Sequence, residues 1–243
     1  MNKESYIMSR MPRRTFLLLA IAALALVTPV PIHAWELHDT ALERVSFPSG
    51  THKVAAETSA DFDRDGIPEM LALTRGRAAI QTGDQIRWQS PGPWQVRQAM
   101  IADLNRDGLP EAVLLVWRPF KPWPVDAWLP NGGRINNFHD SHGLSCHIIL
   151  IGWYQNSFRE RWAGSALAEP VDRFAVADLR GDGQGYLITL EGNYDDPPSA
   201  PSKHLKVWEW NGFGFSLVST LEGPFSLMAT IQSKDGRMLI LAD

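Results

Sequence analysis

The segment Asp61–Glu69 reads DFDRDGIPE, with acidic side chains at positions 1, 3, 5 and 9 and glycine at position 6. Oxygen ligands at alternate positions, followed by a residue that can adopt a positive φ, are what a loop needs to surround a hard divalent cation. Calcium takes about six to eight oxygens, which side chains, a backbone carbonyl and water can supply. The segment therefore predicts a calcium-binding loop.

The same pattern recurs along the chain. Asp103–Glu111 reads DLNRDGLPE, and Asp178–Gly183 starts the motif a third time as DLRGDG. We expect Ca²⁺ in the first two loops, where Ile67 and Leu109 would contribute their backbone carbonyls. The predicted ligands are Asp61, Asp63, Asp65, Ile67, Glu69, Asp103, Asn105, Asp107, Leu109 and Glu111.

The third loop departs from this pattern. Arg180 stands at its third position and Tyr186 at its ninth, which leaves Asp178 and Asp182 as the carboxylates. A guanidinium there would repel a metal ion, so we expect Arg180 itself to neutralise the loop.

Two other interpretations of the acidic loops are weaker. An EF-hand needs a glutamate at position 12 and flanking helices. Position 12 is Ala72 in the first loop and Leu114 in the second, and the flanks resemble strands. A merely solvated acidic turn would suit aspartate and glycine, but two near-identical copies disfavour it.

The sequence around the loops predicts β-structure. Apolar runs at 70–73, 112–117 and 186–190 follow the three loops, as expected for strands buried on both faces. Short strand-like stretches precede the loops, and helical spacing is absent after residue 35. Several strands per unit, with units tens of residues long, are typical of a β-propeller.

The two chain ends each lack a complete unit. A fourth, partial unit comprises Phe225–Ile231 and Met238–Ala242, while Trp35–Phe47 precedes the first complete unit. We therefore predict that the N-terminus supplies the missing outer strand of the last blade. The predicted fold class is all-β, a small β-propeller of about four repeats closed by pairing of N- and C-terminal strands. It forms a single domain, 35–243, with insertions at about 118–146 and 192–203.

The Asp-x-Asp/Asn-x-Asp-Gly-x-Pro-Glu loops before apolar strands resemble FG-GAP/VCBS-type repeats, relatives of the N-terminal propeller of integrin α-subunits. The resemblance covers about residues 54–243 and is specific over the three loop-plus-strand segments. It implies a secreted or surface-exposed calcium-binding propeller that acts as a binding or scaffold domain. Most propellers of this family have more than four blades.

The first 34 residues predict an export signal. Basic residues precede an apolar run at 16–27, and Ile32–Ala34 offers a cleavage site. The segment Arg13–Leu17 also resembles a twin-arginine signal. We therefore expect a secreted or extracytoplasmic, cell-envelope-associated protein without a transmembrane segment, unless the signal is retained as an anchor.

The net charge argues against nucleic-acid binding, and the cysteine content argues against an intrachain disulfide. Removing residues 1–34 takes away four basic residues and one acid, which changes the formal net charge from −4 to −7. An acidic protein is a poor nucleic-acid binder, because binding to phosphate requires basic residues. The single cysteine, Cys146, precludes an intrachain disulfide.

The first insertion contains a second candidate metal group. Histidine and cysteine can bind zinc or copper, and a histidine beside an acid can support hydrolysis. The group lacks a second spaced ligand pair, so Zn²⁺ is not expected. The alternative is a loop whose histidines are hydrogen-bonded locally. The candidates are His139, Asp140, His142, Cys146 and His147.

The two insertions also predict a partner surface. Each follows the second strand of its blade, so both should lie at the end opposite the calcium loops, and function is often carried by such loops. The candidate partner-binding residues are Trp117, Arg118, Trp123, Trp128, Tyr194 and Asp195.

The predicted function is a non-catalytic binding or scaffold module for a protein or carbohydrate partner. The alternatives are a secreted metal-dependent enzyme that uses the histidine group and a structural subunit of an envelope complex. The chain contains no nucleophile elbow, phosphate loop or metalloprotease helix, so an enzyme is not the favoured interpretation.

Overall fold

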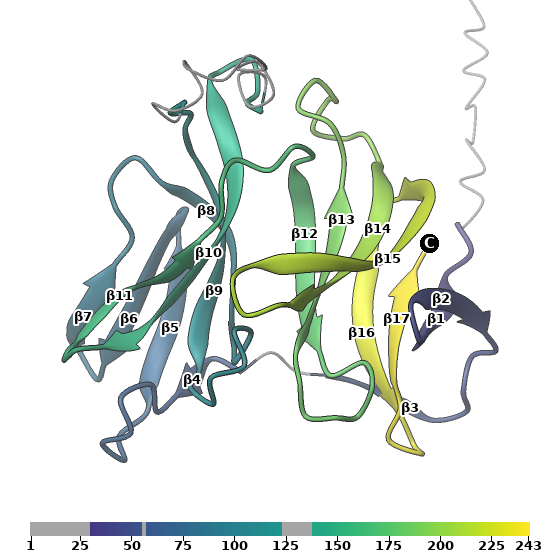
Figure 1. The fold of residues 1–243 in the computed structure, drawn as a ribbon, viewed down its shortest axis with the longest axis horizontal. Helices are drawn as coiled ribbons and strands as arrows, with labels where there is room; N and C mark the ends of the chain where they lie inside the picture. The colour runs from purple at the N-terminus through teal and green to yellow at the C-terminus, as the bar shows by residue number, and fades with distance from the viewer. Residues whose placement is uncertain (1–29, 55–56, 123–137) are drawn as a thin grey trace, which may run out of the picture. The chain divides into compact units, whose positions relative to one another are not determined.

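The computed structural model describes residues 30–54, 57–122 and 138–243, and the compact unit within it spans Pro31–Asp243 (Figure 1). Across these ranges the regular elements are β-strands, arranged in four antiparallel sheets. The described residues contain no helix that could cross a membrane. The export signal predicted for residues 1–34 lies almost entirely outside the described ranges.

The four sheets form a four-bladed β-propeller, as predicted. The first blade contains, from its inner to its outer strand, β4 (Ser59–Ala60), β5 (Glu69–Thr74), β6 (Arg77–Thr82) and β7 (Gln85–Gln89). The second contains β8 (Gln95–Ala102), β9 (Glu111–Pro119), β10 (Leu144–Tyr154) and β11 (Ser157–Ala163). The third contains β12 (Val171–Ala177), β13 (Tyr186–Glu191), β14 (Ser202–Trp210) and β15 (Phe215–Phe225).

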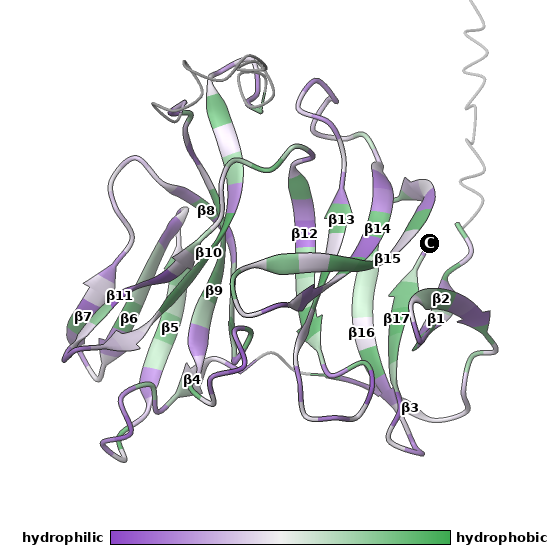
Figure 2. Ribbon diagram, viewed as in Figure 1, coloured by the Kyte–Doolittle hydropathy of each residue, from purple (hydrophilic) through white to green (hydrophobic). Residues whose placement is uncertain are grey.

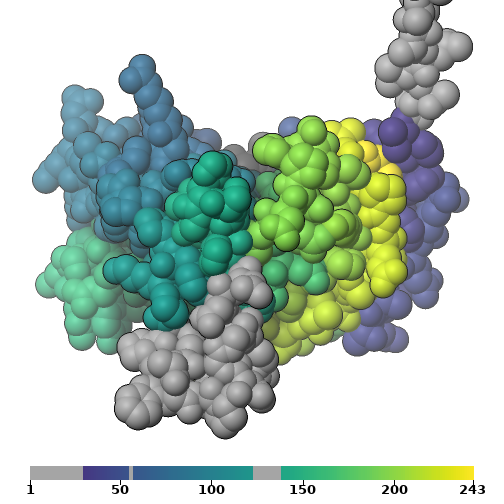
Figure 3. Space-filling model, turned by 90° about the horizontal axis from the view of Figure 1, so that it is seen from above, coloured from purple at the N-terminus to yellow at the C-terminus, as the bar shows by residue number. Residues whose placement is uncertain are grey.

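The fourth blade combines both ends of the chain. The C-terminal strands β16 (Met228–Ser233) and β17 (Met238–Ala242) are extended by β1 (His33–His38) and β2 (Ala41–Val45). β1 pairs antiparallel with β17, and β3 (Thr51–Lys53) pairs with β16 on the inner edge. In Figure 3 the N-terminal strands lie beside the C-terminal ones. Closure by both termini is confirmed, with two N-terminal strands on the outer side where one was predicted and a third, β3, on the inner edge.

Buried apolar side chains fill three of the junctions between successive blades. A different cluster serves each junction, represented by the pairs Ile80 and Ile149, Leu150 and Phe174, and Ile188 and Ile240. Because side chains alternate across a strand, neighbouring residues of β10 contribute to two junctions. This explains the hydrophobic character of β9, β10 and β17 along their length (Figure 2).

Burial on both faces was predicted for the second strand of each blade. It is confirmed for β9 and β13 but wrong for β5, where Met70 is 45% and Leu73 is 40% exposed. Among the described residues, no buried cluster joins the first blade to the fourth, and β4 pairs with β5 over only two residues. An apolar run therefore does not guarantee a partner on each face.

The insertions are shorter than predicted, because the strands beside them extend further. β9 continues to Pro119 and β10 begins at Leu144, so the second-blade insertion spans 120–143. In the third blade, β13 ends at Glu191 and β14 begins at Ser202, so the insertion spans 192–201.

The closing strands should contribute substantially to stability. Leu37 of β1 is buried in the cluster between the third and fourth blades, so Leu37→Ala should lower the free energy of unfolding by about 2–4 kcal/mol. Ile86→Ala, at a side chain that is 56% exposed, should change it by less than about 0.5 kcal/mol. Urea denaturation of both variants checks this, and equal effects would contradict it.

Candidate functional site

The acidic loops all leave the propeller at one end. Residues 61–68 (loop 1) join β4 to β5, and residues 103–110 (loop 2) join β8 to β9. Because successive strands are antiparallel, such connections lie together at the lower end in Figure 1, here called the loop end. The β9–β10 and β13–β14 connections leave at the opposite end, called the insertion end. The predicted separation of insertions from acidic loops is confirmed.

The first aspartate of each loop shapes the loop. Asp61 accepts hydrogen bonds from the backbone N–H groups of Asp65 and Gly66, at 3.1 and 3.0 Å. Asp103 makes the equivalent bonds to Asp107 and Gly108, at 3.1 and 2.8 Å. These bonds are local, which explains why the motif alone predicts the turn.

The loops also need left-handed backbone. Gly66 has φ of 88° and Gly108 has φ of 82°, a conformation that glycine adopts at little cost. The aspartate at position 5 bonds to position 7, because Asp65 accepts the N–H of Ile67 at 2.8 Å and Asp107 accepts that of Leu109 at 3.0 Å. Both residues predicted to supply a carbonyl are thus held inside the turn by their own N–H.

Each loop brings three carboxylates together. In loop 1, Asp61, Asp63 and Asp65 have oxygens within 4.8 Å of one another. In loop 2 the group is Asp103, Asp107 and Glu111. Asn105, predicted as a ligand, accepts the N–H of Asp107 at 2.9 Å. Both predicted metal loops can therefore hold a metal ion, but with different ligand sets.

The difference lies in the glutamate at position 9, which is buried in both loops. One oxygen accepts a backbone N–H, from Phe62 to Glu69 at 3.0 Å and from Leu104 to Glu111 at 3.1 Å. The other oxygen of Glu69 lies 3.4 Å from the Thr82 hydroxyl and 3.5 Å from a guanidinium nitrogen of Arg87.

The other oxygen of Glu111 is buried without a hydrogen-bond partner among the described residues. Burial raises the pKa of Glu111 to about 8; the Leu104 N–H lowers it, and the negative charges of Asp107 and Asp103 raise it further. Burial also raises the pKa of Glu69, opposed by the Phe62 N–H and Arg87. A carboxylate oxygen without a hydrogen-bond partner, beside two aspartates, is suited to binding a cation.

Arginines from the outer strands partly neutralise both loops. Arg87 of β7 contacts Asp63 at 3.1 Å as well as Glu69, whereas Arg161 of β11 contacts Asp107 at 2.9 Å. The sequence analysis missed both arginines. The recurrence of an arginine in the outer strands of the first and second blades was the available signal. Loop 1 has two of its acids paired, and loop 2 keeps Glu111 unpaired, so loop 2 fits a cation better.

The third loop folds through Asp178, which accepts N–H bonds from Gly181, Asp182 and Gly183. We expected Arg180 to neutralise these carboxylates, but it does not pair with them. Its guanidinium instead donates to the carbonyl of Asp39 in the β1–β2 turn and lies over the ring of Tyr186. Arg180 therefore links the third blade to the fourth.

The predicted histidine–cysteine group does not converge on a metal position. Cys146 and His147 are adjacent in β10, so their side chains point to opposite faces, and Cys146 contacts the backbone of Val171. Asp140 accepts the N–H groups of His142 and Leu144, each at 2.9 Å. His139 bonds to the carbonyl of Asp140 at 2.8 Å. These side chains hold the chain entering β10.

Both ring nitrogens of His147 have hydrogen-bond partners. Its ring nitrogens contact the Ser145 hydroxyl at 2.8 Å and the carbonyl of Gly164 at 3.0 Å. Burial lowers the pKa of His147 to about 4; the Gly164 carbonyl raises it and the charge of Arg118 lowers it. The imidazole is therefore neutral near pH 7 and anchors the chain after β11.

Two of the predicted partner-binding residues are structural instead. Trp117 is 5% exposed, and its ring packs edge-on against Tyr194 and beneath Arg97. The Tyr194 hydroxyl donates to the carbonyl of Leu167 at 2.8 Å and accepts the N–H of Cys146 at 3.1 Å. Tyr194, from the third-blade insertion, thus joins the second and third blades.

The other partner candidates differ in accessibility. Arg118 is half-buried and lies over the ring of Trp94, while Asp195 is exposed. Trp123 and Trp128 fall outside the described residues.

Together these features define a four-bladed, all-β propeller with acidic loops at one end and two insertions at the other. No family model, curated protein or solved structure matches the chain. Its function is therefore inferred from the geometry.

Without divalent ions, Glu111 should make stability depend on pH. Its folded pKa of about 8 exceeds the ordinary value of 4.5, so its stabilising contribution is complete below about pH 4.5 and disappears as pH rises through 8. Glu111→Gln should flatten this dependence, while Glu222→Gln, at an exposed site, should not. Urea denaturation in EDTA at pH 6 and pH 9 measures both, and identical pH profiles for the two variants would refute the assignment.

The Tyr194 hydroxyl should matter for stability. Tyr194→Phe keeps the ring but leaves the Cys146 N–H and the Leu167 carbonyl without their partner, so the free energy of unfolding should fall by about 1–2 kcal/mol. Tyr154→Phe, at a side chain that is 47% exposed, should change it by less than about 0.5 kcal/mol. Thermal and urea denaturation would expose an error if the two variants behaved alike.

Proposed function

We propose that this chain is an exported, calcium-stabilised β-propeller of the FG-GAP/VCBS type that acts as a non-catalytic binding module for a protein or glycan partner. The four-bladed fold fits a binding or scaffold role. Two acidic loops that can hold a metal ion support the metal part of the proposal.

The observation that carries the calcium proposal is the buried, unpartnered oxygen of Glu111. Burial raises the pKa of this carboxyl to about 8, so without a cation it is protonated near pH 7, and a bound cation would favour its ionised form. Asp103 and Asp107 place two further carboxylates beside it. These three carboxylates would hold the ion, and the ion would link the loop to Glu111, the first residue of β9.

Calcium suits this ligand set better than zinc. All the side-chain donors are oxygens, and hard oxygen donors favour calcium or magnesium, whereas zinc prefers nitrogen and sulfur ligands. The loop also leaves room in its ligand set for water and a backbone carbonyl, and calcium accepts such flexible, many-oxygen coordination. The proposed role of the ion is structural.

Export is supported by the signal-like N-terminus. Cleavage after Ala34 would remove the first two residues of β1, including the buried Ala34. Of the three β1 residues that pair with β17, Trp35 would remain, opposite Ile240. Secretion, or residence outside the cytoplasm at the cell envelope, remains our proposal.

A binding role is preferred to an enzymatic one because the histidine–cysteine group does not converge. The two ends of the propeller also differ, since the loop end carries the acids and the insertion end carries the connections of variable length. We therefore place partner binding at the insertion end, with calcium supporting the scaffold from the other.

Calcium should stabilise the protein in proportion to occupancy. Extracellular modules bind calcium at about 10⁻⁴–10⁻³ M, so 1 mM calcium should add about 0.4–1.4 kcal/mol per site. The melting temperature should rise by about 1–5 °C. Calorimetry after EDTA treatment measures binding directly. An unchanged melting curve together with no heat of calcium binding would contradict the calcium proposal.

The two loops should bind calcium with different affinities. Glu111→Gln should abolish the tighter site, and Arg87→Met, which removes the cation beside Asp63 and Glu69, should tighten the weaker one. Asp63→Asn is the matched control, because it gives loop 1 the amide that Asn105 provides in loop 2. Titration isotherms of the three variants distinguish the sites.

A further inference from the structure

Two cavities at the insertion end share one wall. The first, of about 430 Å³, lies between the second and third blades, and the second, of about 580 Å³, lies beside the β7–β8 connection. Both are bordered by Gly164, Ser165 and Ala166. These residues belong to segment 164–170, here called the connector, which links β11 to β12.

The connector is held firmly against the blades. The Gly164 N–H bonds to the carbonyl of Ile148 at 3.2 Å, and the Leu167 N–H bonds to that of Cys146 at 3.0 Å. Two side chains secure it from the other side, because His147 bonds to the Gly164 carbonyl and Tyr194 donates to the Leu167 carbonyl. The shared wall is thus a rigid surface, which lowers the entropic cost of binding.

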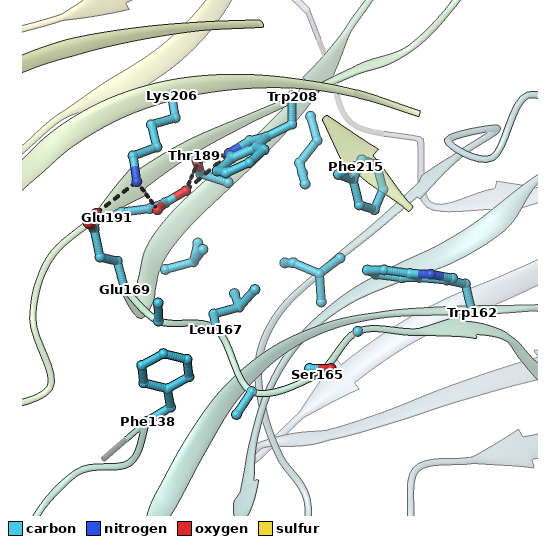
Figure 4. Close-up of a pocket in the computed structure, with 16 residues that line it drawn as sticks. Phe138, Trp162, Ser165, Leu167, Glu169, Thr189, Glu191, Lys206, Trp208 and Phe215 are labelled. Carbon is cyan, nitrogen blue, oxygen red and sulfur yellow. Dashed lines mark hydrogen bonds and ion pairs between the residues drawn. The ribbon is translucent and has the colours of Figure 1, made fainter. Parts of the chain in front are cut away.

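The first cavity has aromatic walls and an acidic end (Figure 4). Trp162, Trp208 and Phe215 line it on the side of the strands, and Phe138 lies across from them. Glu169 lies at the end of the cavity where the connector meets β12. An apolar chamber with a few polar groups at one end is the usual form of a ligand site.

The acidic end has more negative than positive charge. The ammonium of Lys206 lies 2.8 Å from Glu169 and 2.9 Å from Glu191, so one cation serves two carboxylates. Glu191 is further bonded by Trp208 and Thr189. Among the described residues, His204 and Lys206 both contact Oε2 of Glu169, each at 2.8 Å, which leaves Oε1 able to accept.

The second cavity has the opposite charge. Arg118 and Lys121 line it, together with Trp94 and several prolines, and none of its described lining residues is acidic. His147, which also lines it, is neutral near pH 7 because its pKa lies near 4. The two cavities therefore place a basic end and an acidic end on either side of one connector.

We propose that the two cavities and the connector between them form one binding surface, here called the groove, for a short extended peptide. An acidic group of the peptide lies at Arg118 and Lys121, and a basic group lies at Glu169. This inference rests on the proposed binding function and names its ligand. Gly164 and Glu169 are five residues apart, a span of at most about 17 Å. The two charges of the peptide should therefore lie within about four to six residues of each other.

The charges favour a peptide over a neutral glycan. Both ligands can pack against tryptophan, and sugar hydroxyls can hydrogen-bond to charged groups, but a neutral sugar cannot neutralise the charge at either end. A peptide with one acid and one base compensates both ends and can bury apolar side chains between them. Complementary charges also fix the direction in which it binds.

The test uses two pentapeptides, KLPLD and DLPLK, acetylated and amidated so that only their side chains are charged. Binding is measured by calorimetry and tryptophan fluorescence at 5 mM calcium. We expect one of the two to bind at least about threefold more tightly than the other. Replacing its lysine by norleucine or its aspartate by asparagine should weaken binding about threefold to tenfold.

A double-mutant cycle then assigns each charge to its residue. Glu169→Gln should weaken the lysine peptide but leave the norleucine peptide unchanged, and Lys121→Gln should do the same for aspartate against asparagine. Lys121 is exposed, so its variant tests the groove even if Glu169→Gln perturbs folding. Glu222→Gln, which borders a different hollow, should bind like the parent protein.

Three outcomes would overturn the proposal. They are peptide binding that ignores these charges, preferential binding of chitotetraose as a neutral glycan probe, and no peptide binding by a protein that still binds calcium. The last outcome removes the groove and leaves the calcium proposal intact. Peptide binding without calcium binding would uphold the groove and refute only the metal proposal.

Discussion

The pairing of β1 with β17 is the contact on which the rest of the structure depends. An open propeller would end in an unpaired strand at each chain terminus, and such edges invite aggregation. Here residues more than two hundred positions apart, such as Trp35 and Ile240, pair side by side. The same strands bring Leu37 and Leu42 into the cluster between the last two blades, so closure and core formation occur together.

Closure organises the two ends of the molecule differently. Connections between inner strands are short and repeated, and the first aspartate of each acidic loop folds them by local hydrogen bonds. Position 4 then ties the blades together. Arg64 reaches the carbonyl of Gly108, and Arg106 lies over Tyr186 of the third blade. The loop end is thus a chain of contacts from blade to blade.

At the insertion end, long-range hydrogen bonds replace local ones. Tyr194 and His147 both bind the connector, and each comes from a different blade. They convert an irregular segment into a fixed wall, beside which two cavities with opposite charges can persist. Rigid walls with charged ends are suited to selective binding, because the cost of ordering them was met on folding.

The sequence alone was sufficient for the repeat, the fold class, the closure by both termini and the shape of the acidic loops. The shape of a loop depends on local contacts, since its aspartate binds N–H groups four and five residues away. Closure was predicted instead from the incomplete units at the two ends of the chain. Continuous apolar runs also identified β9 and β13 as buried strands. The same rule failed for β5, because burial depends on what packs against a strand and not on its own composition.

Only the tertiary structure decided which acids have partners. Arg87 reaches Asp63 across 24 positions, and Arg161 reaches Asp107 across 54. Nothing in the near-identical loop motifs distinguishes Glu69 from Glu111, yet one is paired and the other is not. The same holds for Trp117 and Tyr194, whose residue types suggested a surface and whose contacts place them in the scaffold. Partners that are distant in sequence determine burial and charge, and these determine which residues can bind a ligand.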